Sequence, residues 1–531
     1  MKKKDLIFFR VALIAMIAAS CGDMEKINTD PNNPQSVPSN MIFGGAQKKV
    51  MDYVYDNWFS GRQCLVYSQY WAQRNYTEED RYQIRESVNN NYFNHLYVII
   101  ANMNEVIALN SDPKTAGASA IYGNNNNQIA AAKIMRAWVF SIITDTWGNV
   151  PYFEVGKLKE GVSYPKYDDQ AVIYEELIKE LTEAADMIDK NEPAFIGGDR
   201  IYGGDALKWK KFANSLKCRL ALHTSKVSGS KWRQHISDAL DSGVFESNAD
   251  AAAYHYSATA PEQCYFYRGY FIDGRNDFTI TRPFADILKG VRDTLNNKTH
   301  PWEGTVDPRL AMFTTPRNDE YIGIPFGIPS SAMLSAYRNM SPNWYAAPPM
   351  QLKSDFPAPI MTYAELLFII SEYNGFSPAE YAEGVEASID YWSSVSGEPV
   401  SVADKAAYLS AVTRQVDAEA VALQKYIDLF MNGTEAWVEI RRTGYPNQLL
   451  KPGELSVAGS TRPDGRDIRF EPLSDTKGLI IARVKYPTNE STLNGANFNE
   501  AVKKLEDGTN NYYSPMFWDK RRTESPHPAN K

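Results

Sequence analysis

Apolar residues recur every three to four positions over long stretches of the chain, a spacing that predicts amphipathic helices. Residues 171–189 carry such a stripe, with acidic and lysine residues on the opposite side. The stripe consists of Ile173, Leu177, Leu181, Ala184 and Ile188. This pattern predicts a surface helix that buries one face against a neighbour.

Three further segments have helical patterns. Residues 128–148 are apolar over most of the helix surface and end at Gly148, a residue typical of helix C-termini. Residues 205–227 begin at Asp205, which can cap the first turn. Their stripe consists of Leu207, Phe212, Leu216 and Leu220. A shorter helix is expected in residues 232–245, ending at Gly243.

The pattern along the chain predicts a mostly α fold with a loop-rich insertion. Helices joined by short polar segments indicate stacked antiparallel pairs, a tetratricopeptide-like array, although no 34-residue repeat is found. Residues 244–360 instead are rich in Tyr, Pro, Gly and Asn with few helical stripes. We expect one domain, 41–531, with a helical scaffold at about 41–243 and 361–445. The C-terminal part, 446–531, is again irregular.

The loop-rich insertion is where we expect a ligand to bind. Loops this long are functional or disordered, and the many aromatic residues argue against disorder. Ordered loops held on a rigid scaffold are frequent binding surfaces. We therefore call residues 244–360 the ligand lobe.

The N-terminus has the pattern of an export signal. Four basic residues precede an uninterrupted apolar run, Val11–Ala19, which is far shorter than the roughly 20 residues needed to span a bilayer. Residues 1–20 are therefore predicted to be a signal peptide. Cys21, directly after small residues, resembles the lipidated cysteine of a bacterial lipobox. An ordinary signal peptide with a chance cysteine is the alternative.

Lipidation at Cys21 predicts a protein held on a membrane. Several acyl chains give stable anchoring, and the polar, proline-containing residues 21–40 are expected to be a tether. Asp23 and Glu25 look like the acidic tag of lipoproteins exported to the cell surface. We expect an outer-membrane location, with the protein facing the cell exterior.

Charge and cysteine content limit the classes of function. The formal charge of −8 becomes −11 when residues 1–20 are removed, which argues against nucleic-acid binding. Three cysteines remain after Cys21, with no C-x-x-C motif, so zinc and dithiol sites are not expected. These are Cys64, Cys218 and Cys264. Three buried free thiols are favoured over one disulfide.

Catalytic motifs are missing from the sequence. It contains no nucleophile elbow, Walker loop, H-E-x-x-H or dinucleotide fingerprint, and its six histidines lack metal-ligand spacing. No cofactor is expected. Acidic residues are so abundant that a glycosidase pair is not excluded by counting. Asp273, Asn276 and Asp277 could hold Ca²⁺, but a plain turn is favoured because the loop lacks EF-hand spacing.

Paired arginines occur at the end of one predicted helix. Arg441 and Arg442 could capture an anion. The favoured interpretation is structural: the two cations complement the helix dipole and pair with Glu435 or Glu439.

Aromatic residues in the loops are the candidate ligand contacts. Tyr337, Trp344 and Tyr345 lie among Pro, Asn and Ser residues. If exposed to solvent, these rings could stack on sugars or peptide side chains. Arg338 and two asparagines could supply hydrogen bonds to the same ligand. Packing of the loop on itself is the equal alternative. Two further clusters, around Tyr265 and Tyr76, have the same character. The candidate ligand-binding residues are Tyr337, Asn339, Asn343, Trp344, Tyr345, Tyr265, Tyr267 and Tyr76.

Seven segments, in order, make the chain resemble the SusD/RagB family of nutrient-binding lipoproteins over nearly its whole mature length. They are "AAAKIMRAWVFSIITDTWGNVPYFE", "ALKWKKFANSLKCRLAL", "DPRL", "YIGIPFG", "MTYAELLFIISEYNG", "GTEAWVEIRRTGYP" and "RVKYPTNESTLNGANFNEAV". The resemblance implies a SusD-like fold, in which four repeat-like helix pairs carry an irregular lobe. This agrees with the pattern of apolar positions.

The resemblance also implies a function and a partner. Proteins of this family form a lid over a SusC-like TonB-dependent outer-membrane transporter and capture glycans, or in some members peptides, without catalysis. A surface-anchored glycoside hydrolase or peptidase is the alternative, since hydrolysis would need a positioned acid and base. The family's binding residues vary, so the candidate site depends on the loop aromatics alone.

Overall fold

The structure is a computed structural model that describes residues 37–340, 342–524 and 527–530. Within these ranges the chain is mostly α-helical, as the sequence predicts. The predicted signal peptide, Cys21 and all but the last residues of the predicted tether lie outside the described residues. Among the described residues, no helix combines the length and apolar character needed to cross a membrane.

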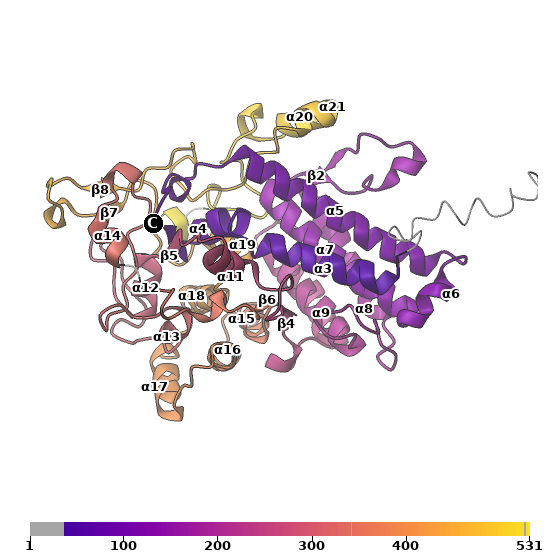
Figure 1. The fold of residues 1–531 in the computed structure, drawn as a ribbon, viewed down its shortest axis with the longest axis horizontal. Coiled ribbons are helices and arrows are strands. Elements are labelled where there is room, and N and C mark those ends of the chain that lie inside the picture. Colours follow the sequence, from indigo (N-terminus) through magenta and orange to yellow (C-terminus); the bar gives the residue numbers. More distant parts are fainter. Residues whose placement is uncertain (1–36, 341, 525–526, 531) are drawn as a thin grey trace, which may run out of the picture.

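An array of long helices forms one half of the molecule (Figure 1). Each helix packs against the next long helix in chain order. The helices are α3 (Ser39–Val54), α5 (Glu86–Ser111), α7 (Asn125–Trp147), α8 (Gln170–Met187), α9 (Ala206–His223) and α10 (Trp232–Ser242). The short α6 (Ala116–Ser119) follows α5. This stacking is the helix-pair array that the apolar spacing predicts.

The predicted ends of these helices are confirmed. Gly148, with φ of 85°, ends α7, and Gly243 ends α10. The Asp205 side chain accepts a hydrogen bond from the Lys208 backbone N–H at 3.1 Å and so caps α9. The predicted apolar stripe of α9 is wrong at Leu207, which is 42% exposed. Trp209 fills the core position in that turn instead.

A second group of helices continues the array. α15 packs against α9, α16 and α18, and α19 packs against α18 and the short helix α4 (Leu65–Tyr67). The group consists of α15 (Tyr363–Tyr373), α16 (Pro378–Ser396), α17 (Val402–Val412), α18 (Ala418–Asp428) and α19 (Gly433–Thr443). Through α15 the later helices extend the earlier stack, although the ligand lobe separates the two groups in sequence.

The ligand lobe contains only short elements. Its helices are α11 (Tyr265–Tyr267), α12 (Arg282–Leu288), α13 (Leu310–Phe313) and α14 (Ser335–Met340). Its strands are β4 (Ala252–His255), β5 (Phe278–Ile280) and β6 (Pro357–Met361). β4 pairs antiparallel with β6, and β5 pairs with β1 (Trp71–Gln73), with Trp71 opposite Ile280. The β1–β5 pair therefore fixes an N-terminal segment against the lobe.

The remaining strands and helices lie at the periphery. β2 (Val150–Pro151) pairs with β3 (Tyr167–Asp168), and β7 (Leu455–Val457) pairs with β8 (Ile468–Arg469). α20 (Glu490–Leu493) and α21 (Gly495–Lys503) project from one edge (Figure 1).

The three described cysteines are buried free thiols, as favoured from the sequence. Cys64, Cys218 and Cys264 are each 0% exposed. Burial raises the pKa of each thiol to about 12, because the thiolate would lose its hydration. They are therefore core residues rather than nucleophiles.

Candidate functional site

An open groove in the ligand lobe brings together segments that are far apart in sequence. It encloses about 500 Å³ and is lined by Arg74, Asn276 and residues from 315–318 and 342–347. We call it the lobe groove. Two of the predicted ligand-binding residues, Asn343 and Tyr345, line it.

A ladder of aromatic rings runs from the core to this groove. The Trp344 ring lies 6.1 Å from Trp71 and 6.3 Å from Tyr270, measured between centroids. Tyr345 follows, 4.5 Å from Tyr270 and 5.9 Å from Phe271. Tyr345 is 46% exposed, whereas Trp344 is 1% exposed. The ladder therefore holds one accessible ring at the groove by means of buried ones.

Two predictions of exposed rings are wrong. Trp344 is buried because the β1–β5 pair brings Trp71 close to it and Tyr270 packs near it as well. Tyr337 is also buried, within a small apolar cluster that includes Ile328 and Val457. Neither ring is placed to stack on a ligand in the present conformation.

The other predicted residues lie outside the lobe groove. Asn339 is exposed on α14, and Tyr76 is 60% exposed in the turn after β1. Tyr265 is half-buried, with the Arg268 guanidinium 5.6 Å from its ring. Tyr267 is half-buried, with its ring 5.3 Å from Phe271 beside the ladder. Their role in binding stays a prediction.

Polar groups surround the exposed ring. The backbone N–H of Arg74 donates to the carbonyl of Asp277 at 2.6 Å, which fixes Arg74 at the groove. Burial raises the pKa of Tyr270 to about 12, while the positive charge of Arg74 nearby acts in the opposite direction. The carbonyl of Asn343 accepts the N–H groups of Ala346 and Ala347, each at 3.1 Å. This turn positions Asn343 and Tyr345 together.

Sequence reasoning missed part of the groove. Arg74 lies beside the aromatic cluster around Tyr76, but nothing in the sequence places it near residues 342–347. Thr315 to Asn318 carried no signal beyond their Pro- and Asn-rich composition. The sequence pattern around Asn276 indicates only a turn or a calcium ligand. Three-dimensional contact alone shows that these side chains share one groove.

The chemistry of the lobe groove suits binding rather than hydrolysis. Its lining residues, all within the described chain, include no Asp, Glu or His. They offer arginine and amide donors, amide acceptors and one aromatic face. Such a surface can hydrogen-bond and stack on a polar ligand, but it lacks the acid and base that hydrolysis requires.

The residues of the calcium candidate lie in the loop just before β5. The Asp277 carboxylate is 3.2 Å from the guanidinium of Arg62 and 3.8 Å from that of Arg275, so its charge is already compensated. Asp273 is exposed, and Asn276 faces the lobe groove.

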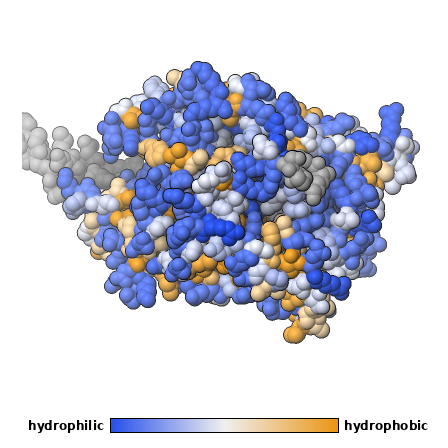
Figure 2. Space-filling model, turned by 180° about the vertical axis from the view of Figure 1, so that it is seen from behind, coloured by the Kyte–Doolittle hydropathy of each residue, from blue (hydrophilic) through white to orange (hydrophobic). Residues whose placement is uncertain are grey.

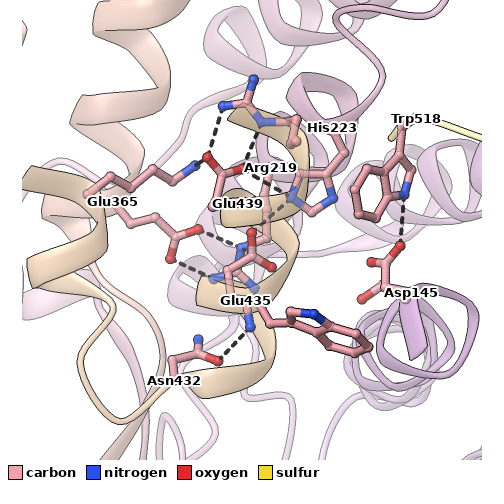
Figure 3. Close-up of polar contacts among 12 residues, drawn as sticks. Asp145, Arg219, His223, Glu365, Asn432, Glu435, Glu439 and Trp518 are labelled. Atoms are coloured by element: carbon pink, nitrogen blue, oxygen red, sulfur yellow. Dashed lines mark hydrogen bonds and ion pairs between the residues drawn. The ribbon is translucent and has the colours of Figure 1, made fainter. Parts of the chain in front are cut away.

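A buried network of charges lies between α9, α15 and α19 (Figure 3). Arg219 donates to both carboxylate oxygens of Glu365, at 2.6 and 2.7 Å. His223 Nε2 lies 2.8 Å from Glu435 and 3.7 Å from Glu439. Burial alone raises the pKa of Glu435, but the charges of His223 and Arg219 outweigh it and lower the pKa to about 2.

His223, Glu435 and Glu439 form the only group within the described residues whose ligand atoms are close enough for a metal ion. However, Arg219 lies 3.7 Å from Glu435, and Lys425 lies 3.3 Å from Glu439. These cations already compensate the carboxylate charges, and they would repel a metal ion at this position. The group is therefore part of a structural ion network that joins α9, α15, α18 and α19.

The paired arginines are part of the same core. Arg442 pairs with Glu439 at 2.9 Å and with Glu372 at 2.7 Å, which confirms the favoured structural interpretation for this residue. Arg441 instead lies 3.6 Å from the Trp437 ring centroid and donates to three backbone carbonyls. Both guanidinium groups are buried, so they do not form a surface anion site.

The rear face of the molecule is mostly hydrophilic, with hydrophobic residues in small scattered groups (Figure 2). No broad apolar surface on that face competes with the lobe groove as a ligand site.

The helical array and the polar, aromatic groove without carboxylates are the features of a ligand-binding protein. The chain belongs to the SusD-like family, whose model, described as "Starch-binding associating with outer membrane", matches residues 31–459. Proteins of this family bind ligands without catalysis, so the chain is a binding protein and the hydrolase alternative does not hold.

Solved structures share the fold over nearly the whole chain. A chitin-binding protein is 25% identical, with a TM-score of 0.70, and the match covers 90% of this chain and 99% of that one. A SusD homolog from Parabacteroides distasonis ATCC 8503 is 22% identical, with a TM-score of 0.69 and coverage of 91% and 97%. A chitin-binding SusD homolog from Flavobacterium johnsoniae is 20% identical, with a TM-score of 0.68 and coverage of 90% and 98%. No curated protein matches the chain.

Proposed function

We propose that this protein captures a nutrient glycan at the cell surface and delivers it to a SusC-like TonB-dependent transporter in the outer membrane. Lipid on Cys21 anchors the chain, and the lobe groove receives the ligand. The observation that carries the proposal is the exposed Tyr345 ring, held by a buried aromatic ladder beside the polar residues of the groove.

A glycan fits the exposed ring and the amide groups of this groove. A sugar ring offers an apolar face for Tyr345 and hydroxyls for Asn343 and Asn276. The family description names starch, and two similar structures are chitin-binding proteins. These names supply the first two probes: a malto-oligosaccharide and a chitin oligosaccharide. A peptide is the second class of ligand that the family resemblance implies.

The test is calorimetric titration of the mature chain with maltoheptaose and with chitohexaose. A base stacked on an aromatic side chain contributes about 1–3 kcal/mol, which serves as a guide for a sugar on Tyr345. Tyr345→Ala should therefore weaken binding roughly 5- to 150-fold. Its thermal unfolding should match that of the wild type, because the ring is half exposed.

Tyr76→Ala tests the rival candidate, since Tyr76 is an exposed tyrosine of the aromatic cluster after β1 and lies outside the lobe groove. It should leave the affinity unchanged. If Tyr76→Ala weakens binding and Tyr345→Ala does not, the ligand binds at the aromatic cluster after β1 instead. If the wild type binds neither glycan, the proposal is overturned for starch-like and chitin-like ligands.

A further inference from the structure

A second, larger groove lies on the helical array. It encloses about 840 Å³ between α5, α7, α8 and the loop 152–166 that connects β2 to β3. We call it the array groove. Along the longest axis of the molecule, these helices occupy the half opposite to β5 and α14, which adjoin the lobe groove (Figure 1).

The wall of the array groove is held in place. The backbone N–H groups of Tyr152 and Phe153 donate to one oxygen of Asp168, at 3.0 and 2.9 Å. The Lys166 N–H donates to Glu154 at 2.9 Å, and β2 pairs with β3 at the base of the loop. The groove is therefore a formed feature of the fold.

A buried carboxylate in this groove is only half satisfied. Glu180 on α8 is 6% exposed and lines the groove. Its Oε1 accepts a hydrogen bond from Arg136 Nε at 3.0 Å. Asn104 orients Arg136, because its Oδ1 accepts a hydrogen bond from Arg136 Nη1 at 2.5 Å. Oε2 accepts no hydrogen bond from the described chain. A buried acceptor without a donor costs free energy of folding, and a ligand hydroxyl would supply the missing donor.

The remaining lining selects against a strongly charged ligand. Five Lys or Arg residues and five Glu residues line the groove, so their formal charges cancel. Several compensate one another directly, such as Lys133 with Glu183 at 3.0 Å. The loop adds apolar rings: Phe153 is 42% exposed, and Tyr152 packs on Phe140 with centroids 4.6 Å apart. Charged groups whose formal charges sum to zero, beside an exposed ring, suit an uncharged polyhydroxyl ligand better than an ion.

We infer that the array groove is a second glycan subsite, in which Glu180 Oε2 accepts a sugar hydroxyl and Phe153 packs on a sugar face. This inference rests on the proposed function, because it assumes that the nutrient is a glycan. Two subsites in opposite halves of one molecule let a long chain bind at both places. The second contact is then intramolecular, and the polymer binds more tightly than a short oligosaccharide.

The test uses chitotriose and maltotriose, each titrated into four chains: wild type, Tyr345→Ala, Glu180→Gln and the double variant. The amide of Glu180→Gln keeps an acceptor for Arg136 but places a donor where Oε2 was. We expect two binding events on the wild type and one on each single variant. The double variant should lose binding by roughly 5- to 150-fold at each site.

Glu175→Gln is the matched control on the same helix, because Glu175 is exposed and does not line the array groove. It should bind like the wild type, and thermal melts should show that every variant is folded. Phe153→Ala provides a second probe that leaves Glu180 intact, and it should also remove the second event.

The outcomes separate the two proposals. The wild type could show a single binding event that Tyr345→Ala abolishes and that Glu180→Gln and Phe153→Ala leave unchanged. That result would support the proposed function and overturn the second subsite. Unchanged glycan binding, with less transporter recovered from membranes by Glu180→Gln, would assign the array groove to the partner protein instead. No binding of either trisaccharide or of the longer oligosaccharides to the wild type overturns both.

Discussion

Trp344 and Tyr345 are adjacent in sequence but have different roles. Trp344 is 1% exposed between Trp71 and Tyr270, so its removal leaves a cavity in the core. Trp344→Ala should lower the free energy of unfolding by about 3–5 kcal/mol, the usual cost of such a truncation. Thermal unfolding followed by circular dichroism measures this, with Tyr345→Ala as the stable control. Equal melting temperatures for the two variants would contradict the ladder.

Asp56 carries a buried carboxyl with an unusual pKa. Burial raises its pKa to about 7, although the backbone N–H of Ser60, at 2.9 Å, acts in the opposite direction. The unfolded pKa is near 3.9, so Asp56 stabilises the fold only while it is protonated, and this contribution is lost as the pH rises toward 7.

Asp56→Asn keeps an acceptor for Ser60 and removes the titration. The melting temperature of this variant, relative to the wild type, should therefore increase between pH 5 and pH 8. The change in relative stability should be at most about 1.4 kcal/mol per pH unit in this window. A difference that does not depend on pH would show that Asp56 is ionised at both values.

Sequence reasoning worked best where residues are periodic. The ends of α7, α9 and α10 followed from Gly148, Asp205 and Gly243, because caps act locally. The lobe has no period, so the sequence could not tell which of two neighbouring rings faces inward. Trp71, far away in the sequence, decides this by packing close to Trp344. Arg74 reaches the groove through the same long-range strand pairing.

Helix α3 contains two adjacent glycines that are in different environments. A Cβ on Gly44 would lie 2.4 Å from the carbonyl oxygen of Gly198, whereas a Cβ on Gly45 would have no neighbour within 4 Å. Alanine favours a helix over glycine by about 0.5–1 kcal/mol. Gly45→Ala should therefore raise the melting temperature, and Gly44→Ala should lower it.

The measurement is a pair of thermal melts under the same conditions. An increase for both variants would mean that α3 and the 197–198 turn separate easily. That result would contradict the close packing of α3 on this turn.

Helix α19 connects to its neighbours through charge, and this makes the fold sensitive to acid. The pKa of Glu435 is about 2 in the folded chain and about 4.5 when unfolded, so its stabilising effect is complete above pH 4.5 and is lost as the pH falls toward 2. Glu435→Gln should melt below the wild type at pH 7, and the difference should shrink by pH 3.

Glu386→Gln is the control for this effect, because Glu386 is half exposed and pairs with Lys405 at 3.0 Å. Its melting temperature should follow that of the wild type at both pH values. A gap for Glu435→Gln that is as large at pH 3 as at pH 7 would show that the network does not depend on this charge.

At the scale of the whole molecule, no described helix could span a membrane, and the proposed anchor is Cys21. Cys21→Ala should be released from membranes by washing or remain uncleaved. Membrane fractionation and detergent partitioning measure this. A variant that is processed and stays in the detergent phase like the wild type would contradict lipidation at Cys21.

The proposed partner is tested on native membranes. Mild-detergent purification of the tagged wild-type protein should recover a large TonB-dependent protein in nearly equal amount. The Cys21→Ala variant should recover much less, because it no longer shares the membrane. Recovery of the lipoprotein alone in several detergents would count against the delivery step.

The aromatic ladder also affects how the ligand specificity of such a protein can change in evolution. Side chains at positions 343 and 345 are exposed, so substitutions there alter what is offered to a ligand at little cost to folding. Position 344 is constrained by its contacts in the core. Ligand specificity and the stability of the fold therefore depend on different residues of one short loop. A lineage could move from one nutrient to another by single substitutions at the tip, with every intermediate still folded.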